Sequence, residues 1–248
     1  MPKFFIPTQN VGEDTIYITG GDVKHIRKVL RMKEGDSLRL CASGGFDYDA
    51  VISSFEDDRI ICGIKSKIKS AAEPNISVTL FQGIPKGSKM DYIIQKTTEL
   101  GISKIVPCIM ERCVVKINND ESARKKTERW QKIAEEAAKQ SGRGAIPEVT
   151  MPVTLDDAVK AMKAMDLCFA PYECETENKL KPVLLSVKNP ETVGFIVGPE
   201  GGFDIEEIEK IRSADIAGIT LGRRILRTET AGEAVLSMIM YEIGDINK

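Results

Sequence analysis

The sequence predicts an α/β protein with two domains: a small N-terminal β-barrel, and a larger domain whose mostly parallel sheet is covered by helices. Short β-rich runs separated by glycine- and aspartate-bearing turns fill the first 70 residues, a pattern typical of small barrels. After residue 76, apolar β-rich runs alternate with amphipathic helical segments, which is typical of a covered parallel sheet. The length of 248 residues is sufficient for two such domains.

The predicted barrel contains five strand-like runs and one helical turn. The strand-like runs are 4–6, 15–18, 37–41, 48–52 and 59–62. The turn opens at Gly21, and four apolar residues are expected to share its buried face: Val23, Ile26, Val29 and Leu30.

A polar stretch separates the two domains. Residues 65–75 lack periodicity and carry Pro74 near their end, which makes them the best candidate linker. We expect the boundary near residue 72, with the barrel at 1–72 and the larger domain at 73–248.

Strands and helices alternate through the larger domain. The predicted strands are 76–81, 102–109, 149–153, 167–170, 192–197 and 216–221. The predicted helices are 88–100, 122–140 and 155–165, with two more beginning after Asp204 and after Thr230. Three residue pairs resemble N-terminal capping boxes: Ser88 with Asp91, Asp204 with Glu207, and Thr230 with Glu233. The last helix is apolar on more than one face, which predicts a subunit interface.

Composition excludes several classes of protein. No apolar run approaches the roughly 20 residues that cross a bilayer, and the N-terminal MPKFFIPTQN lacks the apolar core of a signal peptide. The six cysteines are dispersed without a CxxC pair, which indicates a reduced, cytoplasmic protein without a zinc site. A single histidine, His25, excludes a multi-histidine metal centre, so no metal is expected.

The net charge of −2 conceals an uneven distribution. Residues 76–145 hold 13 Lys and Arg against 8 Asp and Glu, a local net charge of +5. Such a basic segment suits a polyanion. The alternative is a lysine-rich helix face that is merely solvated.

Two glycine-bearing loops stand out near the C terminus. Each follows a predicted strand and precedes a predicted helix: 198–203, with sequence GPEGGF, and 222–227, with sequence GRRILR. In an α/β sheet, ligands bind outside the carboxyl ends of the strands. The two loops therefore predict one small-molecule pocket. The alternative is that the glycines only form tight strand-to-helix turns.

Several familiar chemistries are excluded. The chain lacks GxxxxGK[ST], and no GxGxxG follows the first strand of the larger domain, which argues against P-loop and dinucleotide-binding proteins. His25 alone, in the barrel, leaves a Ser-His-Asp hydrolase without its base. What remains is a pocket built mainly of backbone, whose N–H and C=O groups can recognise an adenine.

Both loops carry a resemblance to a known family. Residues 198–203 and the run LGRRILRTETA at 221–231 resemble the signature of RsmE, a ribosomal RNA methyltransferase family of the SPOUT superfamily. Other stretches fit the same family, including KTTELG at 96–101 and the run QSGR at 140–143. Lys3, where the family often has arginine, is a mild departure.

The resemblance has implications for fold and activity. It implies a PUA-like barrel and a SPOUT domain whose C-terminal segment threads a deep trefoil knot. It also implies a homodimer that uses S-adenosylmethionine to methylate the N3 atom of a uridine in 16S ribosomal RNA, free or within the small ribosomal subunit.

Three residues are candidates for catalysis. Methylation at uridine N3 requires loss of the imide proton and stabilisation of negative charge on the uracil oxygens. Arg227 is the candidate electrostatic stabiliser, and Glu200 and Glu229 are the candidates for assisting proton removal. The alternative for Glu229 is a favourable charge at a helix N-terminus.

Binding residues are predicted in two groups. Cofactor contacts, mainly through main chain, are expected from Val197, Gly198, Pro199, Gly201, Gly202, Leu221, Gly222, Ile225, Leu226 and Thr230. The resemblance implies substrate contacts from Arg112, Gln140 and Arg143. Candidate phosphate contacts, for which the alternative is simple solvation, are Lys86, Lys89, Lys24, Arg27 and Arg31.

Two other functions stay open on the sequence alone. A related enzyme could methylate a ribose 2′-hydroxyl or another base. A non-catalytic RNA-binding assembly factor is the second alternative.

Overall fold

A computed structural model describes residues 3–42, 45–117 and 119–247. The chain divides into two compact units. Unit 1 comprises the chain up to Glu73 together with Ala138–Ile146, and unit 2 comprises Pro74–Ala137 and the chain from Pro147 onward. The predicted single boundary near residue 72 does not anticipate the return of residues 138–146 to unit 1.

Unit 1 is built on a five-stranded sheet with strand order β1-β3-β4-β5-β2. The strands are β1 (Lys3–Ile6), β2 (Thr15–Thr19), β3 (Ser37–Ala42), β4 (Phe46–Phe55) and β5 (Arg59–Lys69). β1 and β3 pair in parallel, and the other pairs are antiparallel. Two register shifts between β4 and β5 increase the local twist, so the sheet curls around one apolar core. This curled sheet corresponds to the predicted N-terminal barrel.

The helical turn of unit 1 differs from its prediction. A 3-10 turn, η1 (Thr8–Asn10), precedes β2, and the predicted turn itself is α1 (Gly21–Lys24) followed by the π-helix η2 (His25–Val29). Val23 and Ile26 are buried as expected, but Val29 is 65% exposed and Leu30 is 39% exposed. The wider π turn, closed by a bond from Leu30 N–H to His25 O, rotates these two residues off the 3.6-residue period.

Unit 2 contains a parallel sheet with strand order β12-β10-β11-β6-β7-β8, and β9 also pairs with β7. The strands are β6 (Ser77–Gly83), β7 (Lys104–Ile109), β8 (Glu148–Val149), β9 (Val153–Thr154), β10 (Leu167–Pro171), β11 (Thr192–Val197) and β12 (Ala217–Ile219). Every pairing among them is parallel, as the sequence predicts. The run predicted as one strand at 149–153 is instead two short strands.

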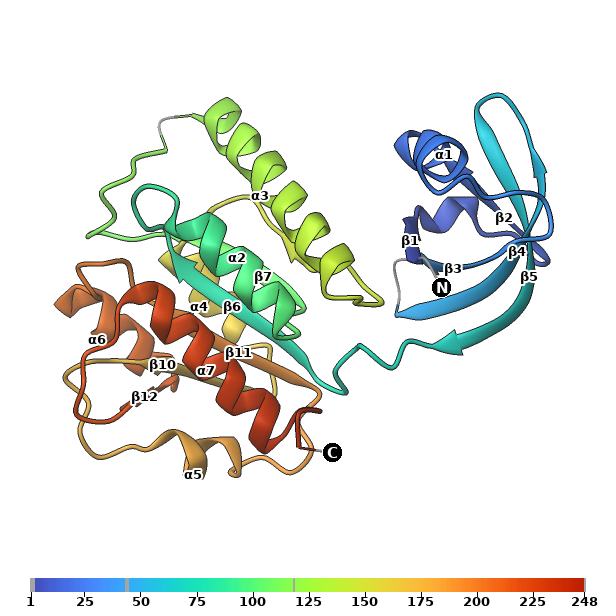
Figure 1. Ribbon diagram of the computed structural model, residues 1–248. Helices are drawn as coiled ribbons and strands as arrows, with labels where there is room; N and C mark the ends of the chain where they lie inside the picture. Colours follow the sequence, from blue (N-terminus) through green and yellow to red (C-terminus); the bar gives the residue numbers. More distant parts are fainter. Residues whose placement is uncertain (1–2, 43–44, 118, 248) are drawn as a thin grey trace. The chain divides into compact units, whose positions relative to one another are not determined.

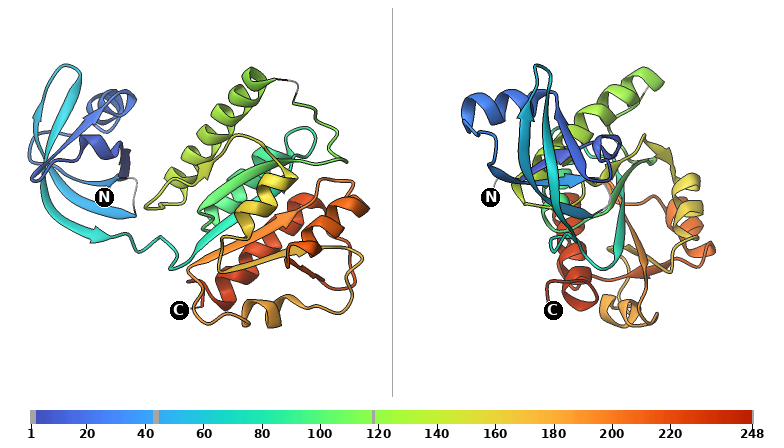
Figure 2. Two further views of the ribbon diagram at one scale, coloured as in Figure 1. Left: turned by 180° about the vertical axis from the view of Figure 1, so that it is seen from behind. Right: turned by 90° about the vertical axis from the view of Figure 1, so that its right-hand side faces the viewer.

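Helices cover both faces of this sheet (Figure 1). They are α2 (Lys89–Glu99), α3 (Asp120–Gln140), α4 (Leu155–Met162), α5 (Leu180–Leu184), α6 (Ile205–Ser213) and α7 (Thr228–Glu242). Alternate residues of β11 face opposite layers: Phe195 packs with α2, α5 and α7, and Ile196 packs with α4 and α6. Figure 2 shows the α4 and α6 layer from behind.

One of the three predicted capping boxes forms. Asp204 and Glu207 cap α6 reciprocally, with Glu207 accepting from Asp204 N–H at 2.9 Å. Ser88 precedes α2 without a side-chain capping hydrogen bond, and Asp91 pairs with Arg129 instead. The prediction for Thr230 is wrong, because α7 begins two residues earlier, at Thr228.

Candidate functional site

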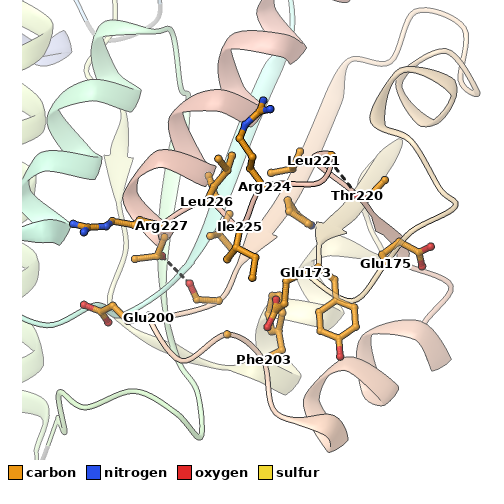
Figure 3. A pocket seen from close by; sticks show the side chains of 18 of the residues that line it. Glu173, Glu175, Glu200, Phe203, Thr220, Leu221, Arg224, Ile225, Leu226 and Arg227 are labelled. Atoms are coloured by element: carbon orange, nitrogen blue, oxygen red, sulfur yellow. Dashed lines mark hydrogen bonds between the residues drawn. The ribbon is translucent and has the colours of Figure 1, made fainter.

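The main cavity of unit 2 lies at the carboxyl ends of β10, β11 and β12 and has a volume of about 1230 Å³. Two loops form most of its wall. The first loop, residues 198–204, joins β11 to α6, and the second loop, residues 220–227, joins β12 to α7. Residues from the last position of β10, Pro171, to Lys179 form a third side (Figure 3). The cavity therefore sits at the sheet edge where α/β proteins bind their ligands.

Most of the predicted cofactor residues line this one cavity. They are Val197, Gly198, Pro199, Gly201, Gly202, Leu221, Gly222, Ile225 and Leu226. Ile225 is 85% exposed and projects into the open space between the two sides of the pocket in Figure 3. Thr230 is exposed on α7 and does not line the cavity; the threonine that does is Thr228.

The backbone geometry of the two loops explains why glycine occupies three of their positions. A Cβ on Gly198 would lie 3.0 Å from the carbonyl carbon of Gly202, and Gly202 itself has a φ of +68°. Gly222 has a φ of +96° with nothing within 4 Å of a Cβ position. Tight turns therefore account for these three glycines, and the same turns expose the backbone that surrounds the cavity.

A charged bridge crosses the rim of the cavity. The Lys89 ammonium lies 3.2 Å from Glu200 Oε1 and 3.4 Å from Glu229 Oε2. Glu200 also accepts a hydrogen bond from Lys86 N–H at 3.1 Å. The structure thus places the predicted RNA contact Lys89 between the two predicted catalytic carboxylates.

This bridge shifts the pKa values of its members. Burial by itself raises the pKa of the Glu200 carboxyl, but the hydrogen bonds from its own backbone, Lys89 and Lys86 hold it below its ordinary value. Burial likewise works to lower the pKa of the Lys89 ammonium, and the hydrogen bond and charge of Glu200, with those of Glu229, raise it instead. Both groups are therefore charged at neutral pH.

Arg227 is exposed at the junction of the second loop and α7. Figure 3 places it on the same side of the pocket as Glu200, whereas Glu173 and Glu175 lie on the other side. In the part of the chain that the structure describes, no acidic side chain pairs with its guanidinium. Its charge is therefore available to a ligand.

Two predicted substrate arginines already have protein partners. Arg112 donates to Gly201 O at 2.9 Å and pairs with Asp204 at 3.1 Å, so it braces the first loop while keeping 41% of its side chain exposed. Arg143 is only 3% exposed, and its guanidinium pairs with Glu73 at 2.7 Å. The prediction that Arg143 faces substrate is contradicted by this burial, because the ion pair and the buried position occupy the group.

The remaining predicted substrate residues stay accessible. Lys86 is exposed in unit 2, and Lys24, Arg31 and Gln140 are exposed in unit 1. Arg27 is half-buried, with its guanidinium over the Phe55 ring at 5.2 Å.

Sequence reasoning missed three residues of the site. Glu173, just beyond β10, lines the cavity, and its Oε1 lies 2.5 Å from where a Cβ on Gly202 would stand. Thr228 and the fully buried Gln82 lie beneath the loops, joined by a hydrogen bond of 2.9 Å. Position after a predicted parallel strand would have signalled Glu173 and Gln82, since the carboxyl ends of such strands meet at one edge.

Two further observations concern metals and membranes. Within residues 3–42, 45–117 and 119–247, no group of three or more His, Cys, Asp or Glu side chains is arranged to hold a metal ion. Over the same ranges, none of the helices combines the length and apolarity that a bilayer span needs. The six cysteines are free thiols.

Comparison with known proteins gives concordant matches for both units. Residues 72–240 match the family described as RNA methyltransferase domain, and residues 18–65 match the RNA methyltransferase PUA domain. Among characterised relatives, ribosomal RNA small subunit methyltransferase E of Bacillus subtilis is 36% identical over 98% of this chain and 97% of its own length. The protein of that name from Aquifex aeolicus is 34% identical over 89% of this chain and 91% of its own length.

Solved structures agree with these matches. A ribosomal RNA small subunit methyltransferase E from Neisseria gonorrhoeae, bound to S-adenosyl methionine, has a TM-score of 0.84 at 31% identity and covers 99% of both chains. A putative methyltransferase from Legionella pneumophila, in complex with the same cofactor, has a TM-score of 0.82 at 32% identity and covers 98% of both chains.

Proposed function

The chain belongs to the family of ribosomal RNA small subunit methyltransferase E, and on this premise we propose that it methylates the N3 atom of a uridine in 16S ribosomal RNA with S-adenosylmethionine. The observation that carries the proposal is the cavity at the carboxyl ends of the strands, with its backbone walls and, at its rim, Arg227, which forms no ion pair with an acidic side chain of the described residues. Both relatives with bound cofactor share this fold over nearly their whole length.

The cavity suits S-adenosylmethionine. The cofactor combines an adenosine, which backbone amides and apolar walls can hold, with a sulfonium that supplies the methyl group. Main chain of residues 197–202 and 221–226 would hold the adenosine, and the open space around Gly222 leaves the backbone accessible. Glu173 adds a carboxylate without a protein ion pair in the described part of the chain, which favours a cationic ligand.

The charged rim would handle the uridine. Arg227 stabilises the negative charge that develops on the uracil oxygens when the N3 proton leaves. Glu200 uses its carboxylate to hold Lys86 N–H and Lys89, whereas the buried Glu229 Oε2 faces the Lys89 ammonium at the longer distance of 3.4 Å. Because Glu200 holds both Lys86 N–H and Lys89, it is the residue that orients Lys89, and Glu229 is the better proton acceptor.

RNA contacts would come from both units. The accessible candidates are Lys86, Arg112, Gln140, Lys24, Arg27 and Arg31. Because each phosphate contact releases counterions, binding of rRNA should weaken steeply with salt. If the logarithm of the rRNA-binding constant did not change with the logarithm of the salt concentration, these residues would not contact phosphate groups.

Assembly and topology complete the proposal. Met238 and Tyr241 of α7 are exposed, as is Tyr92 of α2, and α2 packs against α7 in one apolar cluster. This apolar surface supports a homodimer. Light scattering of the purified protein measures its mass directly. A monomer at micromolar concentration would exclude the homodimer. We include in the proposal a cytoplasmic location and a deep trefoil knot threaded by the C-terminal segment.

One experiment separates the proposed function from its alternatives. Primer extension on 16S rRNA from a deletion strain should read through a uridine at which wild-type RNA stops, because an N3 methyl blocks Watson–Crick pairing. A lost 2′-O-methyl or a different base would indicate another RNA position. In the deletion strain, expression of the Arg227→Ala variant should not restore the primer-extension stop, although the purified variant should keep its affinity for the cofactor within several-fold. Absence of S-adenosylmethionine binding by calorimetry would leave only an assembly factor.

A further inference from the structure

A glutamine at the end of β6 lies at the centre of a buried chain of hydrogen bonds. Gln82 is 0% exposed. Its Nε2 donates to Thr228 Oγ1 at 2.9 Å and to Gly83 O at 2.9 Å. The Thr228 hydroxyl in turn donates to Gly198 O at 2.7 Å. Three segments far apart in the sequence therefore meet at one hydroxyl group.

This hydroxyl joins the two loops of the cavity. Gly198 is the first residue of the first loop, and Thr228 directly follows the second loop. In the described part of the chain, no other direct hydrogen bond joins residues 198–204 to residues 220–228. The bond from Thr228 to Gly198 thus fixes the separation of the two walls.

Gln82 controls the direction of that bond. A threonine hydroxyl can donate one hydrogen bond and accept others, and its proton rotates to suit its neighbours. Because the Gln82 amide donates to the Thr228 oxygen, the threonine proton is directed to the Gly198 carbonyl. Without this amide the hydroxyl is free to rotate away from the Gly198 carbonyl.

Packing holds Gln82 itself in place. In the parallel register, Gln82 lies beside Val197, the residue before Gly198. A Cβ on the next residue, Gly83, would lie 2.6 Å from the ring and the nitrogen of Pro199. The end of β6 therefore serves as a rigid floor beneath the first loop.

We propose that Gln82 is a positioning residue for the cofactor pocket, which sets the separation of the two loops through Thr228. The loops are then held at their working distance before a ligand arrives, so little ordering is left for binding to impose. The identity of the ligand rests on the proposed function; the geometric claim does not.

The test uses matched pairs of variants in the full-length protein. Gln82→Met and Thr228→Val each remove a hydrogen bond of the series Gln82–Thr228–Gly198, and Thr228→Ser keeps the hydroxyl. The controls are Thr97→Val, which removes an equally buried hydroxyl that bonds Ile93 O at 2.7 Å inside α2, and Gln131→Met, which removes a glutamine bonded to Pro147 and Val149. Neither control residue lines the cavity.

Calorimetry with S-adenosylmethionine is the first readout. We expect Gln82→Met and Thr228→Val to raise Kd at least tenfold, Thr228→Ser to stay within about threefold of the wild type, and both controls to stay within about twofold. The double variant Gln82→Met/Thr228→Val should be less than additive, because the second change removes a bond that is already broken. If the two site variants lower Tm but leave Kd as the controls do, Gln82 only stabilises the fold and the proposal is overturned.

Amide hydrogen exchange in the ligand-free protein is the second readout. Gln82→Met should speed exchange in residues 198–204 and 220–227, whereas Gln131→Met should leave both loops unchanged. This readout does not depend on the cofactor. A wild-type protein that fails to bind S-adenosylmethionine would contradict the proposed function, and unchanged exchange in Gln82→Met would contradict the role of Gln82.

Discussion

Two bridges join the first loop to the start of α7, which directly follows the second loop, and they differ in charge and burial. The inner bridge runs from Gln82 through Thr228 to Gly198 and is neutral and buried. The outer bridge runs from Glu200 through Lys89 to Glu229 and is charged and partly solvated, with the Lys89 side chain 29% exposed.

The difference indicates that the two bridges have different roles. Removing one partner from a buried hydrogen bond leaves the other without water to replace it, so the inner bridge resists rearrangement. A partly exposed ion pair is screened by salt and contributes little net stability, so the outer bridge can exchange partners when a polyanion and a base arrive. The floor of the cavity is thereby fixed, and its rim is adaptable.

A third pair separates the effect of burial from the effect of charge. Glu73 and Arg143 of unit 1 are charged like the outer bridge and buried like the inner one. Glu73 also accepts from Gly144 N–H at 2.7 Å and Ala145 N–H at 2.9 Å. These bonds attach residues 143–145 to the end of the barrel, which explains why residues 138–146 belong to unit 1.

The largest effect is expected from breaking this buried ion pair. Arg143→Met leaves the Glu73 carboxylate buried with only backbone donors and should lower the free energy of unfolding by about 3–5 kcal/mol. Urea denaturation measures this change in the free energy of unfolding. Arg124→Met, at an exposed arginine whose partner Glu128 lies 3.9 Å away, is the control and should change stability by no more than ~0.5 kcal/mol. Equal losses in the two variants would mean that burial does not govern the strength of these pairs.

An intermediate effect is expected from disturbing the floor beneath the inner bridge. Gly83→Ala places a methyl 2.6 Å from the backbone nitrogen of Pro199, and such overpacking should cost about 1–3 kcal/mol and weaken cofactor binding. Chemical denaturation and calorimetry measure the two effects. Gly21→Ala, with nothing within 4 Å of its new Cβ, is the matched control. A stable Gly83→Ala protein with unchanged Kd would show that the floor is not rigid.

The smallest effect is expected from the outer bridge. Lys89→Met should lower stability at pH 7 by no more than ~1 kcal/mol, and 1 M salt should remove most of the difference from the wild type. Thermal unfolding at low and high salt checks both statements. A loss that persists in high salt would show that the outer bridge is as rigid as the inner one.

The same variant has a defined pH dependence. The pKa of Glu200 is lowered in the folded protein, so its stabilisation is complete above its ordinary value of 4.5 and is lost as pH falls through the folded pKa. The pKa of Lys89 is raised, so its contribution is complete below 10.5 and is lost as pH rises through the folded pKa. The difference in the free energy of unfolding between the wild type and Lys89→Met should therefore be constant between these two pH limits. Below the lower limit and above the upper one, the difference should shrink toward zero. A difference that grows toward acid pH would contradict the lowered pKa of Glu200.

Local signals in the sequence succeeded where short-range contacts decide the structure. The capping box of Asp204 and Glu207 spans three residues, so its pattern is complete within one turn of chain. Alternation of strands and helices predicted the parallel sheet, because burial on both faces requires apolar runs. The two glycine loops were found because tight turns need residues that tolerate a positive φ, as Gly202 and Gly222 do.

The sequence by itself therefore determined the fold class, the position of the cavity and most of its backbone lining. Only the tertiary structure decided which side chains are engaged there. The chain buries Arg143, sets Lys89 between Glu200 and Glu229, and uses Thr228 where the sequence pointed to Thr230. Gln82 contacts a residue 146 positions away. A sequence pattern records neighbours along the chain, whereas hydrogen bonds and ion pairs of this kind depend on which strand ends the fold brings together.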